Sequence, residues 1–299
     1  MKIGSMGKYE INNKCWILVS CFSFILKMPN YKLTIEYEGT NYHGWQRQKT
    51  KVTVQEIIER TLEKIFKEKI TLIGQGRIDA GAHALGQVAN FKTSPVRNRS
   101  PFGDRTEMPE AIPVSNGINP LHLKKALNSM LPLDIRINDA QIADDKFHSR
   151  YRAKMRHYKY LVYNDEKTVW LRNLAYYEPY KLNIKKMNKA AKYLIGKHDF
   201  SPFQSSGSPA KTPVKTIKQI KISKENFFFF AGSDFPVIRF DIKADAFLYK
   251  MVRNIIGALF EVGRGKIQPA EIKDIINKKE KRKGQVVPAC GLYLMQVKY

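Results

Sequence analysis

The chain has few cysteines and few acidic residues. Its three cysteines, Cys15, Cys21 and Cys290, are an odd number without metal-ligand spacing. The sequence therefore predicts neither a disulfide framework nor a metal site, and it fits a reducing cytoplasm. The N-terminal apolar run over residues 15–26 is shorter than the about 20 residues that a membrane-spanning helix needs. These shortages exclude a disulfide-rich secreted scaffold and predict a protein without a membrane span.

The N-terminal apolar run has the length of a signal-peptide core, and three lysines precede it. A signal peptide would continue into a cleavage site of small residues, but Lys27-Met28-Pro29-Asn30 follows instead. We therefore interpret residues 1–28 as an extension outside the fold, or as sequence that precedes a true start at Met28.

The shortage of acidic residues leaves a large positive charge. In 299 residues, 52 Lys and Arg oppose 27 Asp and Glu, for a net charge of +25. Such an excess favours an acidic partner, nucleic acid first and a membrane surface second, although Lys-rich codon usage also contributes to it in some genomes. With 43% hydrophobic residues, the chain can bury one large core or two of ordinary size.

Apolar periodicity predicts strands and helices in mixed order. Thr53 and Glu56 have the spacing of a capping box at a helix start, and Gly196 is placed to end a later helix. The expected strands cover residues 31–37, 71–74, 87–92, 135–142, 156–163, 214–222, 227–231, 237–243 and 291–297; the expected helices cover 54–66, 121–131, 184–195, 248–262 and a short segment from Pro269.

This order lacks a strict βαβ rhythm and indicates an α+β protein with antiparallel sheets. We expect an N-terminal domain over residues 29–133 and a C-terminal domain over 134–299. A long surface loop over 93–120 is rich in Pro, Arg, Ser and Asn, and the basic run 278–283 is expected to be a solvated turn.

The segment with the most chemical potential is the glycine-rich run from Gly74 to Ala84. Arg77 and Asp79 stand two residues apart between glycines that permit tight turns. The run has neither the third glycine of a dinucleotide fingerprint nor the pattern of a P-loop. By itself, an aspartate in such a loop is more often a turn former than a catalyst.

Residues 76–83 read GRIDAGAH and resemble the GRTDAGVH motif of the tRNA pseudouridine synthase A family. Further segments resemble that family in the same order along the chain. They are YEGTNYHGWQRQ at 37–48, TVQE at 53–56, FHSR at 147–150 with RHYKY at 156–160, FLYKMVRNI at 247–255 and GLYL at 291–294.

The resemblance implies isomerisation of uridine to pseudouridine at positions 38 to 40 of the tRNA anticodon arm, by a cytoplasmic homodimer without a cofactor or metal. It also implies two similar α+β halves whose antiparallel sheets join into one extended sheet, with helices packed on it and a positively charged cleft between the halves. Asp79 would be the catalytic nucleophile, Arg253 its cationic partner, Arg77 the residue that helps to displace the base, and Tyr158 the aromatic residue against the uracil.

Each of these residues also has a structural interpretation. Arg253 could be a solvent-facing helix residue, Tyr158 plain core packing, and Arg77 half of a salt bridge that stabilises a turn. The family usually has Thr where Ile78 stands, and often His where Lys250 stands. The stretch 97–119 is longer than the family's linker, and its arginines 97, 99 and 105 are candidates for tRNA contacts.

Two rival functions stay open. A non-catalytic RNA-binding protein on the same fold would use the basic surface and leave Asp79 as a turn residue. Another enzyme that cleaves glycosidic bonds would need paired carboxylates, and the loop motif contains only one.

A chain shortened to residues 28–299 is expected to fold and to modify tRNA like the full chain, because the first predicted strand begins at Tyr31. Thermal unfolding and tritium release from C5-labelled uridine in tRNA would measure the two properties. A loss of either would show that residues 1–27 belong to the enzyme.

Overall fold

The computed structural model describes residues 28–94, 117–207, 210–228, 234–277 and 284–299. Its helices are α1 (Val54–Phe66), α2 (Pro120–Met130), α3 (Ile184–Ala191), α4 (Met251–Gly263) and α5 (Glu271–Asn277). Its strands are β1 (Asn30–Tyr37), β2 (Ile73–Gly74), β3 (His83–Lys92), β4 (Ile135–Ala143), β5 (Met155–Tyr163), β6 (Tyr176–Tyr177), β7 (Gly196–Asp199), β8 (Val214–Phe228), β9 (Asp234–Ala244) and β10 (Leu292–Lys298).

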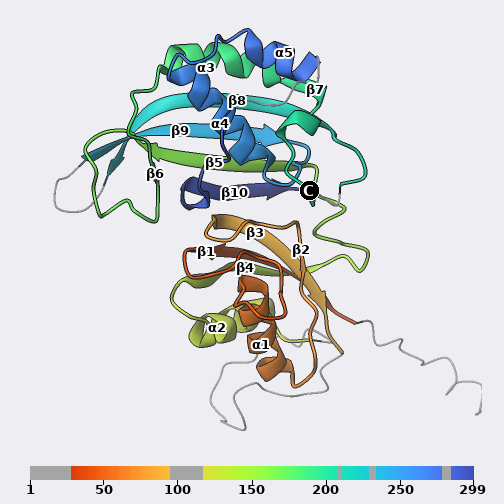
Figure 1. Cartoon of the computed structure of the whole chain (residues 1–299). Coiled ribbons are helices and arrows are strands. Elements are labelled where there is room, and N and C mark those ends of the chain that lie inside the picture. Colours follow the sequence, from red (N-terminus) through yellow and green to blue (C-terminus); the bar gives the residue numbers. More distant parts are fainter. Residues whose placement is uncertain (1–27, 95–116, 208–209, 229–233, 278–283) are drawn as a thin grey trace, which may run out of the picture.

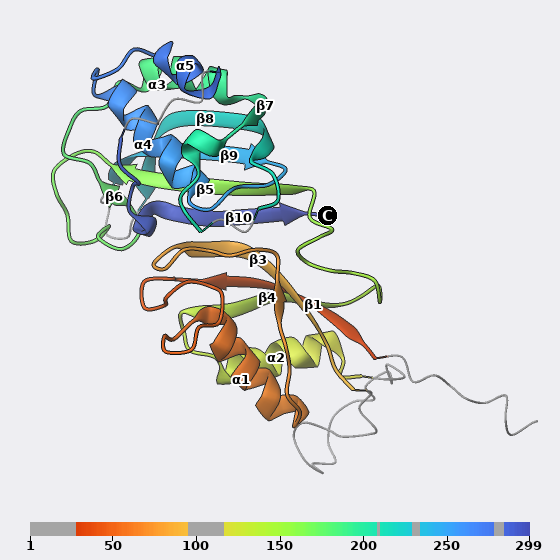
Figure 2. The same ribbon diagram turned by 45° about the vertical axis from the view of Figure 1, so that its right-hand side comes forward.

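These strands form one extended sheet, which confirms the predicted α+β class. Its order is β4-β1-β3-β10-β5-β9-β8-β7, with β2 added beside β3 and β6 beside β5. The N-terminal half carries α1 and α2, and the C-terminal half carries α3, α4 and α5 (Figures 1 and 2). Within each half the strands along this order pair antiparallel, whereas β3 and β10 join the halves as a parallel pair.

The join depends on the last strand of the chain. β10 lies between β3 and β5, with Leu294 opposite Ala84 on one side and opposite Tyr158 on the other. The proposed division into domains at 133/134 stays a prediction; β4, which follows that boundary in sequence, pairs with β1.

Local sequence explains the helix that follows the first strand. The Thr53 side chain accepts a hydrogen bond from the Glu56 backbone N–H, as the capping spacing predicts, while the Glu56 carboxylate pairs with Arg60 at 2.8 Å. The helix ends at Phe66, and Lys67 follows as its C-cap with a left-handed φ of 54°. Its apolar stripe packs into the core of the N-terminal half.

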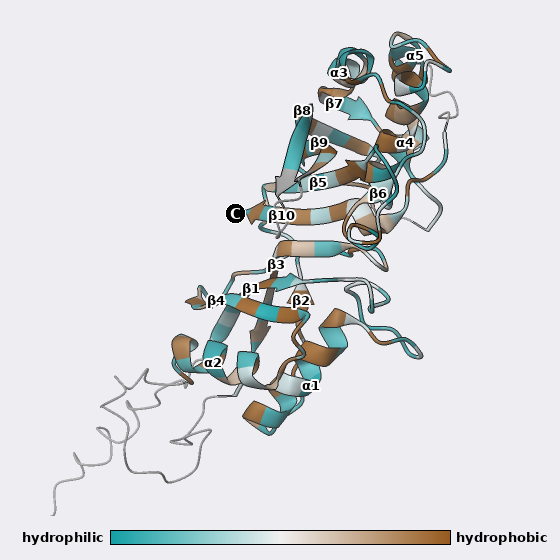
Figure 3. Cartoon of the chain, turned by 90° about the vertical axis from the view of Figure 1, so that its left-hand side faces the viewer, coloured by the Kyte–Doolittle hydropathy of each residue, from teal (hydrophilic) through white to brown (hydrophobic). Residues whose placement is uncertain are grey.

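The core runs through both halves without interruption. Alternate residues of β5, including Tyr158 and Tyr160, point into this core, while Leu161 and Tyr163 join a smaller cluster on the opposite face. Figure 3 shows the corresponding brown and teal bands along the strands of the C-terminal half. In the described part of the chain, no helix combines the length and apolarity that crossing a membrane requires.

Several predicted boundaries were wrong, and long-range pairing is the reason for two of them. β3 begins at His83 rather than at residue 87, because its first residues pair with β10. β8 is one strand over 214–228 rather than two, because pairing with β9 continues through its polar stretch. Strands β6 and β7 were not predicted.

Two helix predictions were too long. α4 begins at Met251 rather than at residue 248, because Lys250 adopts a left-handed φ of 56°. The helix predicted over 184–195 is α3 followed by a 3-10 turn over Lys192–Leu194, and Gly196 then opens β7 with a φ of 113°. The predictions for residues 1–27, most of the 93–120 loop and the basic run 278–283 lie outside the described residues, as does the end of the strand predicted over 227–231.

A buried histidine ties the join together. His83 has 2% exposure, and its Nδ1 accepts a hydrogen bond of 3.0 Å from the Gly39 N–H. Nε2 therefore carries the hydrogen and donates to the carbonyls of Asn173 and Cys290 at 2.8 and 3.0 Å. One imidazole thus links a loop of the N-terminal half to two segments of the C-terminal half.

Replacing His83 by Ala is expected to lower the free energy of unfolding by about 2–4 kcal/mol, because it removes buried volume and leaves backbone groups without partners. Urea unfolding would measure this loss. His198→Ala is the matched control, since His198 contacts only the local carbonyl of Ile195 among the hydrogen bonds described. A loss below about 1 kcal/mol for His83→Ala would contradict this role.

Candidate active site

Asp79 lies in the loop between β2 and β3, and the turn that contains Tyr42 and Trp45 braces this loop. The Trp45 N–H donates to the Ile78 carbonyl at 3.2 Å, and the Gly81 N–H donates to the Tyr42 carbonyl at 3.2 Å. Gly44 stands between them with a φ of 85°, and a Cβ there would lie 2.4 Å from the Ile78 oxygen. The turn around Gly44 and the loop around Asp79 therefore touch through their backbones, which explains why both segments contain glycine.

Arg253 pairs directly with Asp79 across the join of the two halves. Its Nη1 lies 2.5 Å from Asp79 Oδ2, and both side chains are 14% exposed. Its Nε donates to the Val287 carbonyl at 2.6 Å, which fixes the guanidinium in place. The interpretation of Arg253 as a solvent-facing helix residue is therefore wrong.

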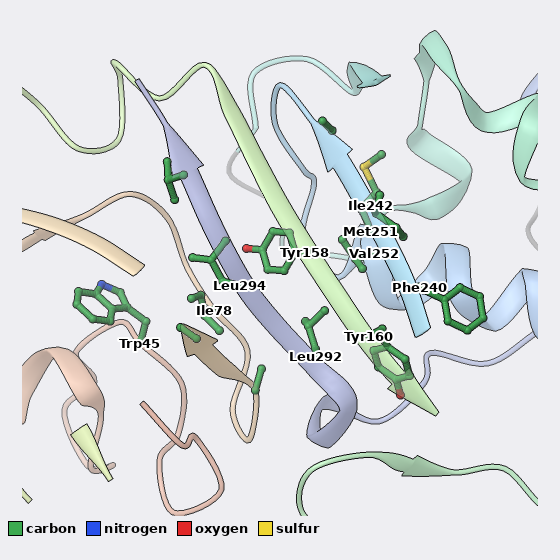
Figure 4. Close-up of a cluster of buried hydrophobic side chains, with 14 of the residues drawn as sticks. Trp45, Ile78, Tyr158, Tyr160, Phe240, Ile242, Met251, Val252, Leu292 and Leu294 are labelled. Atoms are coloured by element: carbon green, nitrogen blue, oxygen red, sulfur yellow. The ribbon is translucent and has the colours of Figure 1, made fainter. Parts of the chain in front are cut away.

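Tyr158 belongs to the core and to the same pocket as Asp79. Its ring is 9% exposed and packs edge-on against Phe247, with centroids 5.1 Å apart. Figure 4 shows its side chain pointing from β5 toward β10, with the hydroxyl on the side of Leu294 and Ile78. Burial raises the pKa of Tyr158 to about 12, and the charge of Asp79 acts in the same direction.

The pocket that contains these residues has a volume of about 380 Å³ and is lined from both halves. Among the described residues, its wall has one carboxylate, Asp79, and seven basic side chains. These are Arg77, Arg150, Arg156, Lys211, Lys215, Lys250 and Arg253. The pocket is therefore suited to a polyanion that presents a neutral group to a single carboxylate.

Arg77 is exposed at this pocket. Among the residues that the structure describes it forms no ion pair, so the proposed turn-stabilising salt bridge is not found there. All four predicted site residues, Asp79, Arg253, Arg77 and Tyr158, thus line one cavity.

The two departures from the family motif have different surroundings. Ile78 is 6% exposed and belongs to the core, so it anchors the Asp79 loop by burial. Lys250 lies at the pocket, directly before α4, with its Nζ 5.1 Å from the Tyr249 ring centroid.

Two further residues, Gln75 and Arg156, line this pocket and had no predicted role. Gln75 directly precedes the GRIDAGAH run, and Arg156 is the first residue of RHYKY. The place of Arg156 in a matched segment and of Gln75 beside one was a signal, but the hydrogen bond between them, 3.2 Å long, joins residues 81 positions apart and could not be predicted from spacing. In the described part of the chain, no group of three or more His, Cys, Asp or Glu residues is arranged to bind a metal ion.

Comparisons with known proteins agree on one family. The model of the family described as tRNA pseudouridine synthase matches residues 33–152 and 190–299. The tRNA pseudouridine synthase A of Acetivibrio thermocellus is 46% identical over 274 residues, which cover 91% of this chain and 100% of the relative. The proteins of that name from Thermoanaerobacter sp. strain X514 and Clostridium kluyveri are 42% and 41% identical over the same shares of both chains. The chain therefore belongs to the tRNA pseudouridine synthase family.

Proposed function

We propose that this protein isomerises uridine to pseudouridine in tRNA, at positions 38 to 40 of the anticodon arm. Family membership supports this reaction. One structural observation supports it for this chain in particular. The carboxylate of Asp79 is paired with Arg253 in a pocket that both halves build and that is otherwise basic.

The reaction breaks the bond between uracil N1 and ribose C1′, turns the base and forms a bond from C5 to C1′. Asp79 is the single carboxylate of the pocket among the described residues, so we assign it the reacting role. Two routes are open to it: attack on C1′ as a nucleophile, or abstraction of a ribose proton. In either route, Arg253 fixes the position of the carboxylate.

The target uridine must leave its stack to reach Asp79, which costs a few kcal/mol. We assign Tyr158 to the extruded uracil, because its ring lines the pocket and base–aromatic stacking contributes about 1–3 kcal/mol. Arg77 is exposed at the same pocket, and we assign it to help displace the base. After the base has turned, C5 must lose its proton. We assign the Tyr158 hydroxyl to assist this proton removal.

We also propose that the basic pocket belongs to a larger cleft that receives the RNA backbone, and that the protein acts as a cytoplasmic homodimer. The seven basic side chains around the pocket support the first point, because phosphate contacts dominate affinity for nucleic acids. The family resemblance supports the second point. Sedimentation of the purified protein would test the dimer.

The rival function is RNA binding without catalysis. A binding protein has no need to pair a carboxylate with an arginine inside a basic pocket, so the Asp79–Arg253 pair favours the enzyme. Tritium release from unmodified tRNA labelled at uracil C5 separates the two, because pseudouridylation expels this hydrogen. Binding without release would contradict the proposed function.

Replacing Asp79 by Asn is expected to abolish tritium release while the affinity for tRNA stays within several-fold. The amide keeps the shape and can still accept a hydrogen bond from Arg253, but it can neither attack nor take a proton. Asp139→Asn is the matched control, since Asp139 lies on β4 and does not line the pocket. Turnover near that of the unmodified enzyme would exclude Asp79 as the reacting group.

Replacing Arg253 by Ala is expected to slow single-turnover isomerisation about 10²-fold, because a carboxylate without its partner loses its orientation. The affinity for tRNA should fall much less. Arg253→Lys keeps the charge but loses the bond to Val287, and an intermediate rate is expected. If affinity falls and the rate does not, Arg253 is a phosphate contact instead.

A further inference from the structure

The guanidinium of Arg156, near the start of β5, is hydrogen-bonded to the protein through all three of its nitrogens. Its Nε donates to Gln75 Oε1 at 3.2 Å. Its Nη1 donates to the Ala153 carbonyl at 3.0 Å and to the Asp245 carbonyl, and its Nη2 donates to the Arg150 carbonyl at 3.3 Å. Four of the five N–H groups of this side chain therefore have acceptors within the protein.

One of these acceptors, Gln75, belongs to the loop that carries Asp79. Gln75 directly follows β2 and is 3% exposed. Its backbone N–H donates to the Val88 carbonyl at 2.9 Å, which fixes the start of the loop to β3. The bond from Arg156 therefore reaches the N-terminal half at an anchored point shortly before Asp79.

A second acceptor, Asp245, begins the opposite wall of the pocket. It directly follows β9, and its Oδ1 accepts hydrogen bonds from the backbone N–H groups of Thr216 and Ala246 at 3.0 and 2.6 Å. These bonds fix the backbone at Asp245. The pocket wall over residues 246–253 follows directly and ends with Arg253.

The other two acceptors, the carbonyls of Arg150 and Ala153, lie between β4 and β5. This connection is the point at which the chain passes from the N-terminal half of the sheet to the C-terminal half. The Arg156 guanidinium thus joins three segments around the pocket: the Asp79 loop, the crossing between the halves and the segment that leads to Arg253.

Arg156 is poorly placed to contact a phosphate directly. Its bonds to the protein leave at most one N–H group for another acceptor. Burial also lowers the pKa of Arg156, which shows that the guanidinium is withdrawn from water. Arg77 and Lys211, in contrast, are exposed at the same pocket and can receive the RNA backbone.

We propose that Arg156 is a positioning residue for the isomerisation: its guanidinium holds the Asp79 loop at a fixed distance from the segment that leads to Arg253, so that the carboxylate and its partner meet in the reactive geometry. This inference rests on the proposed function. Arg253 binds the carboxylate itself, whereas Arg156 acts on the two segments that carry the pair. Displacements of about 1 Å in a reacting group can slow an enzyme about 10²-fold.

Arg156→Lys tests this role while it keeps the positive charge. A single ammonium cannot span the four acceptors, so the Asp79 loop loses its fixed distance to the opposite wall. We expect single-turnover tritium release at saturating tRNA to slow about 10²-fold per folded protein, while the affinity for tRNA stays within a few-fold. Arg136→Lys is the matched control, because Arg136 is an exposed arginine of β4 that does not line this pocket.

The salt dependence of tRNA affinity separates positioning from phosphate binding. Each phosphate contact that is lost lowers the slope of log affinity against log salt concentration by about one. Arg156→Met removes the charge and all four bonds, and it should leave this slope nearly unchanged. A slope lowered by about one would identify Arg156 as a phosphate contact instead.

Gln75→Met separates an effect on the Asp79 loop from a general structural role. It removes the acceptor that Arg156 has in the N-terminal half and leaves the arginine intact. We expect Gln75→Met to slow tritium release in the unmodified enzyme, but to slow the Arg156→Lys enzyme much less, because both changes break the same link. A general structural role predicts independent effects that multiply. Gln75→Met alone tests the inference if Arg156→Lys does not fold.

Three results would overturn the inference: a normal rate in Arg156→Lys or Gln75→Met, a salt slope lowered by about one in Arg156→Met, or multiplied effects in the double variant. No tritium release by the unmodified enzyme would instead reject the proposed function itself.

Discussion

The pairing of Asp79 with Arg253 is the constraint on which the site depends. The two residues are 174 positions apart in sequence and belong to opposite halves of the sheet. Their side chains meet only if the halves keep one relative position. The chain fixes that position with its last strand, since β10 pairs with β3 on one side and with β5 on the other. The His83 imidazole supports the same join from within. The contacts that stabilise the join therefore also fix the geometry of the pocket.

The positive charges around this pair repel one another and so destabilise the protein when no anionic partner is bound. Seven basic side chains around one carboxylate repel one another, and Arg156 among them is held by backbone carbonyls and the Gln75 amide. Burial lowers the pKa of Arg156, a sign that its desolvation is costly. Such an arrangement gains stability when phosphates approach. The net charge of +25 is therefore concentrated in part where a polyanion can compensate it.

Much of this could be predicted from the sequence, and what could not be depends on long-range contacts. The alternation in β1 and the capping spacing at Thr53 are local signals, and both elements form where they were expected. The resemblance of short segments selected Asp79, Arg77, Tyr158 and Arg253 as site residues, and all four line one pocket. The early start of β3 could not be predicted, because its first residues are strand through long-range pairing with β10 and, at Ala84, with Tyr37 of β1. Lys250 was placed inside a helix because its left-handed backbone leaves no mark on the apolar pattern.

The loop around Asp79 shows how one short segment combines anchoring with chemistry. Gln75 and Ile78 are buried and anchor the loop, whereas Arg77, which lies between them in sequence, is exposed. Ile78 replaces a hydroxyl residue of the family motif and contributes its anchoring through the core rather than through a hydrogen bond. Core packing restricts the backbone on one side of Asp79, and the contact between Gly81 and Tyr42 restricts it on the other. The carboxylate therefore has little freedom left before Arg253 binds it, and the ion pair selects an orientation that the loop already favours.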